Sequence, residues 1–287
     1  MVTSQRIVLI ACFFGKLPWY FDYFAHSCGY NPTVDFFIIT DDNAYGKTLP
    51  ANVKLMYKTL DQVVSLASEK LGFAVCIDRG YKMCDFKPAY GVIFSDYLES
   101  YDFWGHTDID IVFGDIREFI TDDLLENYDL ISVRPDWLTG CFLLYRNSAR
   151  FNTLFTHSRD YRKIFTSPVH YCFDETNFAH DAFSDGKHYT NIETEIESMM
   201  HVVKRLEAEH YLKPYFELHI IEGLPGRLRW ENGKMFYRNK YEILLYHMIY
   251  FKKLHKPLKT ETITSAFMIS PTKIYHHKTV KQLSYGV

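Results

Sequence analysis

Continuous apolar runs, each ended by turn residues, are the feature that most constrains the fold of this chain. Strands that are buried on both faces have this pattern. The sequence predicts six such strands, over residues 7–14, 35–40, 53–57, 103–110, 130–134 and 141–146. Helical patterns lie between several of them, over residues 60–71 and 84–98. Gly72 ends the first helix, and Asp85 and Pro88 suit the start of the second. This alternation predicts an α/β fold with a mostly parallel sheet flanked by helices.

The second half of the chain has a different pattern. Helical spacing recurs over residues 148–165, 174–183 and 192–211, and Asn232-Gly233 is typical of a two-residue hairpin turn. Residues 240–253 are apolar enough for a helix or a strand, and periodicity does not decide between them. We therefore expect a single domain over residues 1–255 with a small hairpin and helical C-terminal part, followed by a basic tail over residues 256–287.

Composition supports one folded domain. The 287 residues are 47% hydrophobic and include 22 Tyr and 23 Phe, which argues against global disorder. The first apolar run is too short to span a membrane and has no cleavage site of small residues. The six cysteines form no CxxC pair, as is typical of reduced core thiols, and this favours the cytoplasm.

Charge is unevenly distributed along the chain. The formal net charge is −3, yet from Lys252 onward there are seven lysines and a single acid, Glu261. Such a segment could lie on the anionic inner face of a membrane, where each cation contributes roughly 1 kcal/mol, or could be a solvated terminus. The remainder of the chain is acidic, which argues against nucleic acid as a partner.

Two acids interrupt the predicted strand over residues 103–110. A side-chain period of two places Asp108 and Asp110 on one face, where two unpaired anions repel each other. A divalent cation removes that repulsion, and hard oxygen ligands suit Mg²⁺ or Mn²⁺. The alternative is a strand end that meets solvent, with both acids hydrated.

The residues around this pair resemble a known family. Trp104-Gly105-x-x-Asp108-x-Asp110 is similar to the DxD region of enzymes with the glycosyltransferase-A fold. The ordered blocks FFGKLPWYF, KMCDFKP, FWGHTDID, GCFLLYRN and FDETNF resemble a group of bacterial polysaccharide-associated glycosyltransferase-like proteins, over residues 7–253.

The resemblance implies a Rossmann-like nucleotide-binding half over residues 1–115 and an acceptor half over residues 116–255. It implies metal-dependent transfer of a hexose from a nucleotide diphosphate sugar, UDP-sugars being favoured. The acceptor would be a saccharide or a lipid-linked glycan in surface polysaccharide synthesis.

Candidate donor-binding residues follow the first two strands. Phe14 and Gly15 follow the first, and Asp41 and Asp42 follow the second, at the edge where parallel sheets bind nucleosides. The alternative for the two aspartates is turn formation, which Asp favours in any case.

A second donor group precedes the acidic pair. In resembling transferases a helix at this position contacts the diphosphate, so Lys82 and Lys87 are candidates for phosphate oxygens and Asp85 for a sugar hydroxyl. Structurally, Asp85 could be only a helix cap and the lysines only surface charges.

The resemblance also implies residues at the reacting centre. Glu175 is the candidate base or nucleophile and Asp174 the sugar-hydroxyl ligand, although adjacent acids also favour a helix start. Trp137, Thr139 and Gly140 resemble a segment that lines the donor-sugar and acceptor pocket, and the glycine permits close approach of a sugar ring. Trp137 could instead be a core anchor.

The resemblance further implies that a C-terminal histidine completes the metal site. His247 is that candidate, with Lys252 or Lys253 as a phosphate partner. The alternative is a hydrogen-bonded histidine in the core.

Two other functions remain open from sequence. Asp108-Ile109-Asp110 also matches the nucleophile motif of haloacid-dehalogenase-type phosphatases, which normally carry it on the first strand. A module that binds sugar nucleotides or glycans without turnover is the other alternative.

Overall fold

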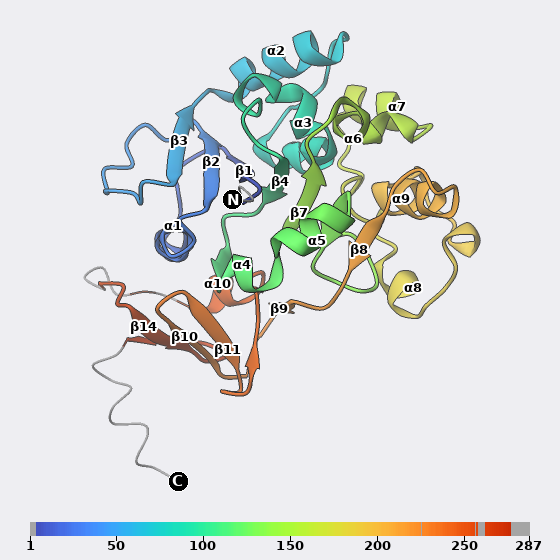
Figure 1. Cartoon of the computed structure of the whole chain (residues 1–287). Helices are drawn as coiled ribbons and strands as arrows, with labels where there is room; N and C mark the ends of the chain where they lie inside the picture. Colours follow the sequence, from blue (N-terminus) through green and yellow to red (C-terminus); the bar gives the residue numbers. More distant parts are fainter. Residues whose placement is uncertain (1–3, 225, 256, 258–261, 277–287) are drawn as a thin grey trace.

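The computed structural model describes residues 4–224, 226–255, 257 and 262–276. It is built around a seven-stranded sheet with the strand order β3-β2-β1-β4-β7-β6-β8 (Figure 1). The strands are β1 (Ile7–Phe13), β2 (Val34–Thr40), β3 (Val53–Tyr57), β4 (Phe103–Thr107), β6 (Leu130–Ser132), β7 (Phe142–Arg146) and β8 (Pro214–Phe216).

Most neighbours in this sheet are parallel. The four strands from β3 to β4 run parallel to one another, as do β6 and β8, whereas β7 is antiparallel to both of its neighbours. The predicted class, a mostly parallel α/β sheet flanked by helices, is therefore confirmed. The predicted strands over residues 7–14, 35–40, 53–57, 130–134 and 141–146 agree with β1, β2, β3, β6 and β7 to within a few residues, because each is a continuous apolar run. Strand β8, at one end of the sheet, was not predicted.

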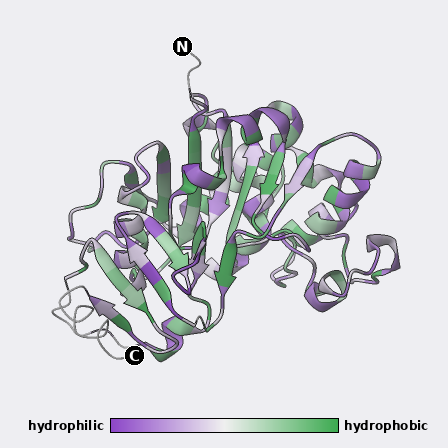
Figure 2. Ribbon diagram, turned by 60° about the horizontal axis from the view of Figure 1, so that its bottom comes forward, coloured by the Kyte–Doolittle hydropathy of each residue, from purple (hydrophilic) through white to green (hydrophobic). Residues whose placement is uncertain are grey.

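The sheet has a hydrophobic core on each face. Alternate residues of β1 contribute to the two cores: Val8 and Ile10 pack on one side, and Ile7 and Leu9 on the other. Helix α1 (Tyr20–Gly29) covers the second side, whereas α2 (Leu60–Leu71) and α9 (Met199–Ala208) cover the first. The strands of the large sheet are predominantly hydrophobic, and the helices around it carry hydrophilic stretches (Figure 2).

Local signals account for α2. Thr59 caps its first turn in a reciprocal pair of hydrogen bonds with Gln62, and Gly72 ends it with a φ of 76°.

The helix predicted over residues 84–98 is different in the structure. A 3₁₀ helix, η1 (Gly80–Ala89), and two short turns, α3 (Tyr90–Ile93) and η2 (Ser95–Tyr97), take its place, and Asp85 caps nothing. Pro88, which has no N–H to donate, lies inside η1.

The later helices are also shorter than predicted. Residues 148–166 form α6 (Ala149–Asn152), η3 (Leu154–His157) and α7 (Tyr161–Thr166). Residues 174–183 contribute only to α8 (His180–Ser184), because Asn177 and Phe178 have positive φ angles of 54° and 64° and break the pattern. The remaining short helices of the described residues are α4 (Ile116–Phe119), α5 (Asp122–Asn127) and η4 (Tyr189–Asn191).

Two smaller sheets extend the large one. The first has the order β5-β13-β9 and consists of β5 (Ile111–Phe113), β13 (Leu245–His247) and β9 (Ile220–Glu222). The second has five strands: β10 (Leu228–Glu231), β11 (Lys234–Tyr237), β12 (Tyr241–Glu242), β14 (Ala266–Ile269) and β15 (Ile274–His276). The hairpin predicted at Asn232-Gly233 joins β10 to β11, and both turn residues have positive φ, 49° and 86°.

Residues 240–253 are neither one helix nor one strand. They form β12, then β13, then the short helix α10 (Phe251–Leu254). Their apolar content therefore reflects packing in two sheets and a helix rather than one regular element.

Part of the expected basic tail belongs to the folded body. Strand β14 pairs with β10, and Phe267 stacks on Trp230 with ring centroids 4.8 Å apart. The prediction missed this strand because it treated the whole lysine-rich segment as a tail. The buried residues Phe267 and Ile269 of β14 alternate with less buried ones, as in a strand with one face in the core. Lys256, Lys259, Lys278 and Lys281 of the expected tail lie outside the described residues. Among the described residues, no helix is long and apolar enough to cross a membrane.

Candidate metal centre and active site

The acidic pair lies in a bend rather than on a strand. Strand β4 ends at Thr107 and β5 begins at Ile111, so the strand period invoked for the pair does not apply. The N–H of Asp108 donates to the carbonyl of Cys141 at 3.1 Å, and the carbonyl of Asp110 accepts from the N–H of Met248 at 2.9 Å. The bend is thus fixed between the start of β7 and the end of β13.

His247 meets the pair because β13 is antiparallel to β5. The register places His247 opposite Ile111, directly after the bend. One ligand atom each from Asp108, Asp110 and His247 lie within 4.8 Å of one another. Two carboxylate oxygens and an imidazole nitrogen are a donor set that fits Mn²⁺ or Mg²⁺. The structure therefore brings together the three residues that the sequence predicts as metal ligands.

Each carboxylate of the pair also has a lysine partner. Lys252 Nζ lies 2.6 Å from Asp110 Oδ2, and Lys87 Nζ lies 2.7 Å from Asp108 Oδ1. Burial acts to raise the pKa of Asp110, but the hydrogen bonds and charges of His247 and Lys252 hold that pKa well below its usual value. The lowered pKa favours the ionised carboxylate, which is the form that a metal ligand requires. Lys253, the other predicted phosphate partner, is exposed.

Lys87 links the acidic pair to the predicted reacting centre. Its ammonium donates to the carbonyl of Gly140 at 2.7 Å and lies 3.6 Å from Asp174 Oδ2, in addition to its bond with Asp108. Only 5% of Lys87 is exposed. Burial acts to lower the pKa of this lysine, but Asp108 and Asp174 raise it well above its ordinary value. A fixed positive charge therefore lies between the two acidic groups.

Asp174 and Glu175 lie in a turn before α8 and differ in their surroundings. Burial, followed by the charges of nearby acids, raises the pKa of Asp174 well above its ordinary value, although Lys87 opposes this. Burial also acts to raise the pKa of Glu175, but hydrogen bonds from His180 and from the Gly140 N–H lower it to about 2. These bonds measure 2.9 Å and 2.5 Å. Glu175 is thus held ionised, while Asp174 retains a proton more readily.

Gly140 lies directly against these carboxylates. A Cβ added to it would lie 2.6 Å from Asp174 Oδ2 and 2.9 Å from Glu175 Oε1. The other two predicted pocket residues have other direct partners, although Trp137 also packs edge-on against His180, the partner of Glu175, with ring centroids 5.2 Å apart. Thr139 is buried and donates its hydroxyl to the carbonyl of Phe142, and the ring of Trp137 is covered by the Arg134 guanidinium at 3.5 Å. In the structure, Trp137 is closer to a core anchor than to an open stacking platform.

Lys82 and Asp85 form a fully buried ion pair with an N–O distance of 2.8 Å. Asp85 also accepts the N–H groups of Tyr171 and Phe173, and Lys82 donates to the carbonyl of Ile164. Neither side chain has exposed surface, so the structure does not place them against a diphosphate or a sugar. They instead fix the segment that leads into Asp174, because buried charges require partners.

A cavity of about 920 Å³ lies at the carboxyl ends of β1 and β2. Asp41 and Asp42 line it and also shape it: Asp41 Oδ1 accepts the Gly15 N–H at 2.6 Å, and Asp42 Oδ2 accepts the Leu17 N–H at 2.8 Å. Phe14 is not among the lining residues and packs beside Gly80.

The cavity adjoins the acidic pair through two consecutive aromatic residues. Trp19 lines the cavity, and the ring of the next residue, Tyr20, lies 5.6 Å from the ammonium of Lys252. Lys252 in turn binds Asp110, so a chain of contacts leads from the cavity wall to the acidic pair.

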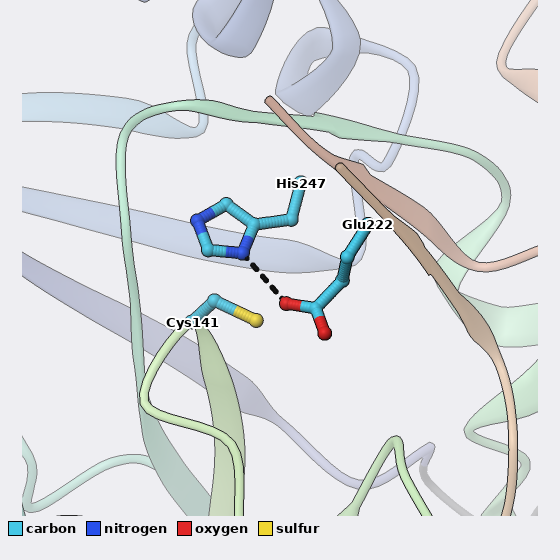
Figure 3. Close-up of side chains that lie close together, drawn as sticks. All are labelled: Cys141, Glu222 and His247. Atoms are coloured by element: carbon cyan, nitrogen blue, oxygen red, sulfur yellow. Dashed lines mark hydrogen bonds and ion pairs between the residues drawn. The ribbon is translucent and has the colours of Figure 1, made fainter. Parts of the chain in front are cut away.

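Sequence reasoning missed Glu222. Glu222 belongs to none of the sequence motifs described above. Its Oε1 nevertheless lies 2.9 Å from His247 Nδ1 (Figure 3). The parallel pairing of β9 with β13 places the two residues opposite each other. No sequence signal marks Glu222, because the contact depends on the register of two three-residue strands. Sequence reasoning also missed His180, the first residue of α8, which binds Glu175. That contact depends on how the chain turns between the two residues, and no motif marks it.

Comparisons with known proteins give one family model and a larger number of solved structures. A model described as "Family of unknown function (DUF6625)" matches residues 9–278. No curated protein matches the chain. The glycosyltransferase GlyE of Streptococcus pneumoniae TIGR4 is 11% identical, with a TM-score of 0.33, over 75% of this chain and 45% of that chain. The galactosyltransferase LgtC, solved with donor and acceptor sugar analogues, is 11% identical, with a TM-score of 0.34, over 58% and 67%. This chain thus spans less than half the length of GlyE, and similarity of this degree does not transfer an activity.

Proposed function

The chain belongs to the family of unknown function DUF6625, and we propose that it is a glycosyltransferase that binds the diphosphate of a nucleotide sugar through a divalent cation. The observation that carries this proposal is the convergence of Asp108, Asp110 and His247 within 4.8 Å. Lys87 adds a direct connection from this group to Asp174. A metal ligand set and an acid pair that share one buried lysine suit a reaction in which a diphosphate leaves a sugar.

The donor set fits Mn²⁺ or Mg²⁺, held by Asp108, Asp110 and His247. When bound, such a cation neutralises negative charge on a leaving diphosphate. The protein supplies two further positive charges next to this position, Lys87 and Lys252. Each is paired with a carboxylate of the acidic pair and lies within reach of a phosphate oxygen bound there.

The nucleoside is proposed to bind in the cavity at the ends of β1 and β2. Its volume of about 920 Å³ accommodates a nucleoside, and Asp41 and Asp42 offer acceptors for a base N–H or a ribose hydroxyl. Gly15, with a φ of 97°, lets the loop turn over these carboxylates. UDP-sugars are the favoured donors.

The sugar is proposed to lie beside Gly140, with Asp174 and Glu175 at its reacting carbon. Glu175 is held ionised, the state that a base or a nucleophile requires. Asp174 retains its proton more readily and can donate to a sugar hydroxyl. Gly140 lets both carboxylates lie close to the backbone at this point, since any side chain there would meet them. The acceptor is proposed to be a saccharide or a lipid-linked glycan, in surface polysaccharide synthesis.

Release of UDP from a panel of UDP-sugars tests the proposal. Purified protein is incubated with UDP-glucose, UDP-galactose and UDP-N-acetylglucosamine, with Mn²⁺ or with EDTA. We expect slow, metal-dependent hydrolysis of at least one donor, because transferases transfer some sugar to water. Asp110→Asn should abolish it, whereas Asp96→Asn, the same change in an exposed surface pair with Lys70, should not.

Two outcomes would contradict the proposal. Full activity of Asp110→Asn would remove the metal site from the mechanism. Cleavage of p-nitrophenyl phosphate in preference to every UDP-sugar would indicate a phosphatase, and metal-dependent binding of UDP without any turnover of donor and glycan acceptors would indicate a binding module.

A further inference from the structure

His247 has a carboxylate at each of its two ring nitrogens. Nε2 lies 3.4 Å from Asp110 Oδ2, and Nδ1 lies 2.9 Å from Glu222 Oε1. The imidazole is almost completely buried, with 7% of the residue exposed. The proposed function uses only the Nε2 side, so the Nδ1 side is unexplained by it.

A third donor completes the Nδ1 side. Cys141, which precedes β7, directs its thiol toward Glu222 and His247 (Figure 3). One ligand atom from each of these three residues lies within 4.8 Å of the others. The donors come from three separate elements, the start of β7 and the ends of β9 and β13, so the fold itself brings them together.

We propose that Cys141, Glu222 and His247 form a second metal site, for a thiophilic divalent cation such as Zn²⁺. Sulfur, nitrogen and oxygen ligands at one point are typical of zinc, whereas Mg²⁺ and Mn²⁺ prefer oxygen. A thiolate and a carboxylate balance the two charges of the ion, and binding releases the thiol proton. Sugar transfer as proposed above needs neither Cys141 nor Glu222, so this site goes beyond it.

The surroundings of Glu222 support a built site. Arg134 holds its other oxygen, Oε2, at 3.0 Å, which directs Oε1 toward His247. Arg134 is itself held by Asp136 at 2.8 Å. The Glu222 side chain is 29% exposed, so solvent can reach this side and supply the fourth ligand of a tetrahedral ion.

The two sites exclude each other because they share one imidazole. A neutral imidazole has a single free lone pair, so a cation bound at Nδ1 leaves the proton on Nε2, facing Asp110. That proton occupies the side on which the Asp108–Asp110 site needs a ligand. Two cations at once would require the loss of both ring protons. Zinc is therefore an inhibitor that acts by removing His247 from the first site.

Metal binding to the full-length protein tests this proposal without any sugar substrate. Zinc affinity is measured by competition with a chromophoric chelator, and Co²⁺ is added as a spectroscopic probe. We expect a thiolate-to-cobalt charge-transfer band that Cys141→Ser abolishes, and at least a tenfold loss of zinc affinity in Cys141→Ser and in Glu222→Gln. Cys76→Ser, a cysteine outside the cluster, should match wild type. Asp108→Asn should weaken Mn²⁺ binding and leave zinc affinity unchanged.

Exclusion is tested by electron paramagnetic resonance of Mn²⁺. Zinc should displace bound Mn²⁺ and restore the signal of the free ion in wild type, and Cys141→Ser should need at least tenfold more zinc for the same displacement, since direct competition at the first site does not involve the thiol. Zinc affinity that is unchanged in folded Cys141→Ser and Glu222→Gln would overturn the second site, and simultaneous binding of both ions would overturn the exclusion. If Mn²⁺ fails to bind at all, the proposed function fails while the zinc measurements still decide the second site.

Discussion

The ammonium of Lys87 donates to Oδ1 of Asp108 at 2.7 Å, and this one bond connects the η1 segment to the bend that carries the acidic pair. Removal of the ammonium leaves Asp108 and the buried Asp174 without their shared cation. Truncating one partner of a buried ion pair typically costs about 3–5 kcal/mol, and partial exposure of Asp108 favours the lower end. We predict that Lys87→Ala lowers the free energy of unfolding in urea by about 3 kcal/mol.

Lys47→Ala is the matched control for this variant. Lys47 pairs with Asp22 at 2.6 Å, but its side chain is 66% exposed. Pairs of this kind contribute about 0–1 kcal/mol, so the control should unfold nearly as wild type does. Equal effects of the two substitutions would show that Lys87 does not act as a buried charge.

Gly140→Ala should reduce activity much more than stability. The φ angle of Gly140 is not in the left-handed region, so alanine fits the backbone, but its Cβ would push against both Asp174 and Glu175. Displacement of reacting groups by about 1 Å costs on the order of 100-fold in rate. We predict a loss of that order in UDP-sugar hydrolysis, with UDP binding retained. Gly226→Ala, outside the nucleoside cavity and with the nearest atom 3.7 Å from the added Cβ, should keep full activity. An equally active Gly140→Ala would exclude these carboxylates from the reaction.

Asp85 should make stability depend on pH in the acid range. Burial acts to raise its pKa, but His170 and Lys82 lower it below the ordinary value. A carboxyl whose pKa is lowered on folding stabilises the protein above its unfolded pKa of about 3.9, and that contribution is lost as the pH falls through the folded value. Asp85→Asn should therefore be strongly destabilised at pH 7, and the difference from wild type should narrow below about pH 4.

Urea midpoints of wild type and Asp85→Asn, compared at each pH, measure this effect, since other titrating groups cancel in the difference. Asp96→Asn, in an exposed pair, should show little change at any pH. A difference for Asp85→Asn that stays constant down to pH 3 would contradict a charged Asp85 in the core.

Phe267→Ala tests whether residues beyond 256 belong to the fold. Phe267 is 1% exposed and stacks on Trp230, so its truncation should cost about 3–5 kcal/mol. Phe178 is 62% exposed, and Phe178→Ala should change stability by less than about 0.5 kcal/mol. A neutral Phe267→Ala would mean that this strand contributes nothing to the fold in solution.

The parts of the fold that follow from local rules were predictable. The strands β1, β2 and β3 are continuous apolar runs, α2 carries both of its end signals, and Asn232-Gly233 specifies its turn. The prediction of one strand over residues 103–110 was wrong, because contacts with distant strands decide where this segment bends. Strand β5 is only three residues long and exists because β13 pairs with it.

The part of the candidate site that lies in recognisable sequence motifs was predictable. Asp108, Asp110 and His247 were expected together and lie together, although the bend rather than a strand orients the acids. Burial was not predictable. Lys82 and Lys87 are separated by few residues and are equally charged, yet Lys82 faces the interior and Lys87 faces the acidic pair. Sequence spacing does not distinguish an ion pair that supports the fold from one that can meet a ligand.

The bond from the Met248 N–H to the Asp110 carbonyl, with the pairing of β13 to β5, also governs when the site can form during synthesis. The ribosome releases β1 to β4 long before residues 245–252, and domains assemble as the chain emerges. A nascent chain can therefore build most of its large sheet while lacking His247 and Lys252. The proposed metal site therefore cannot form until β13 and α10 have been synthesised, after every strand of the large sheet.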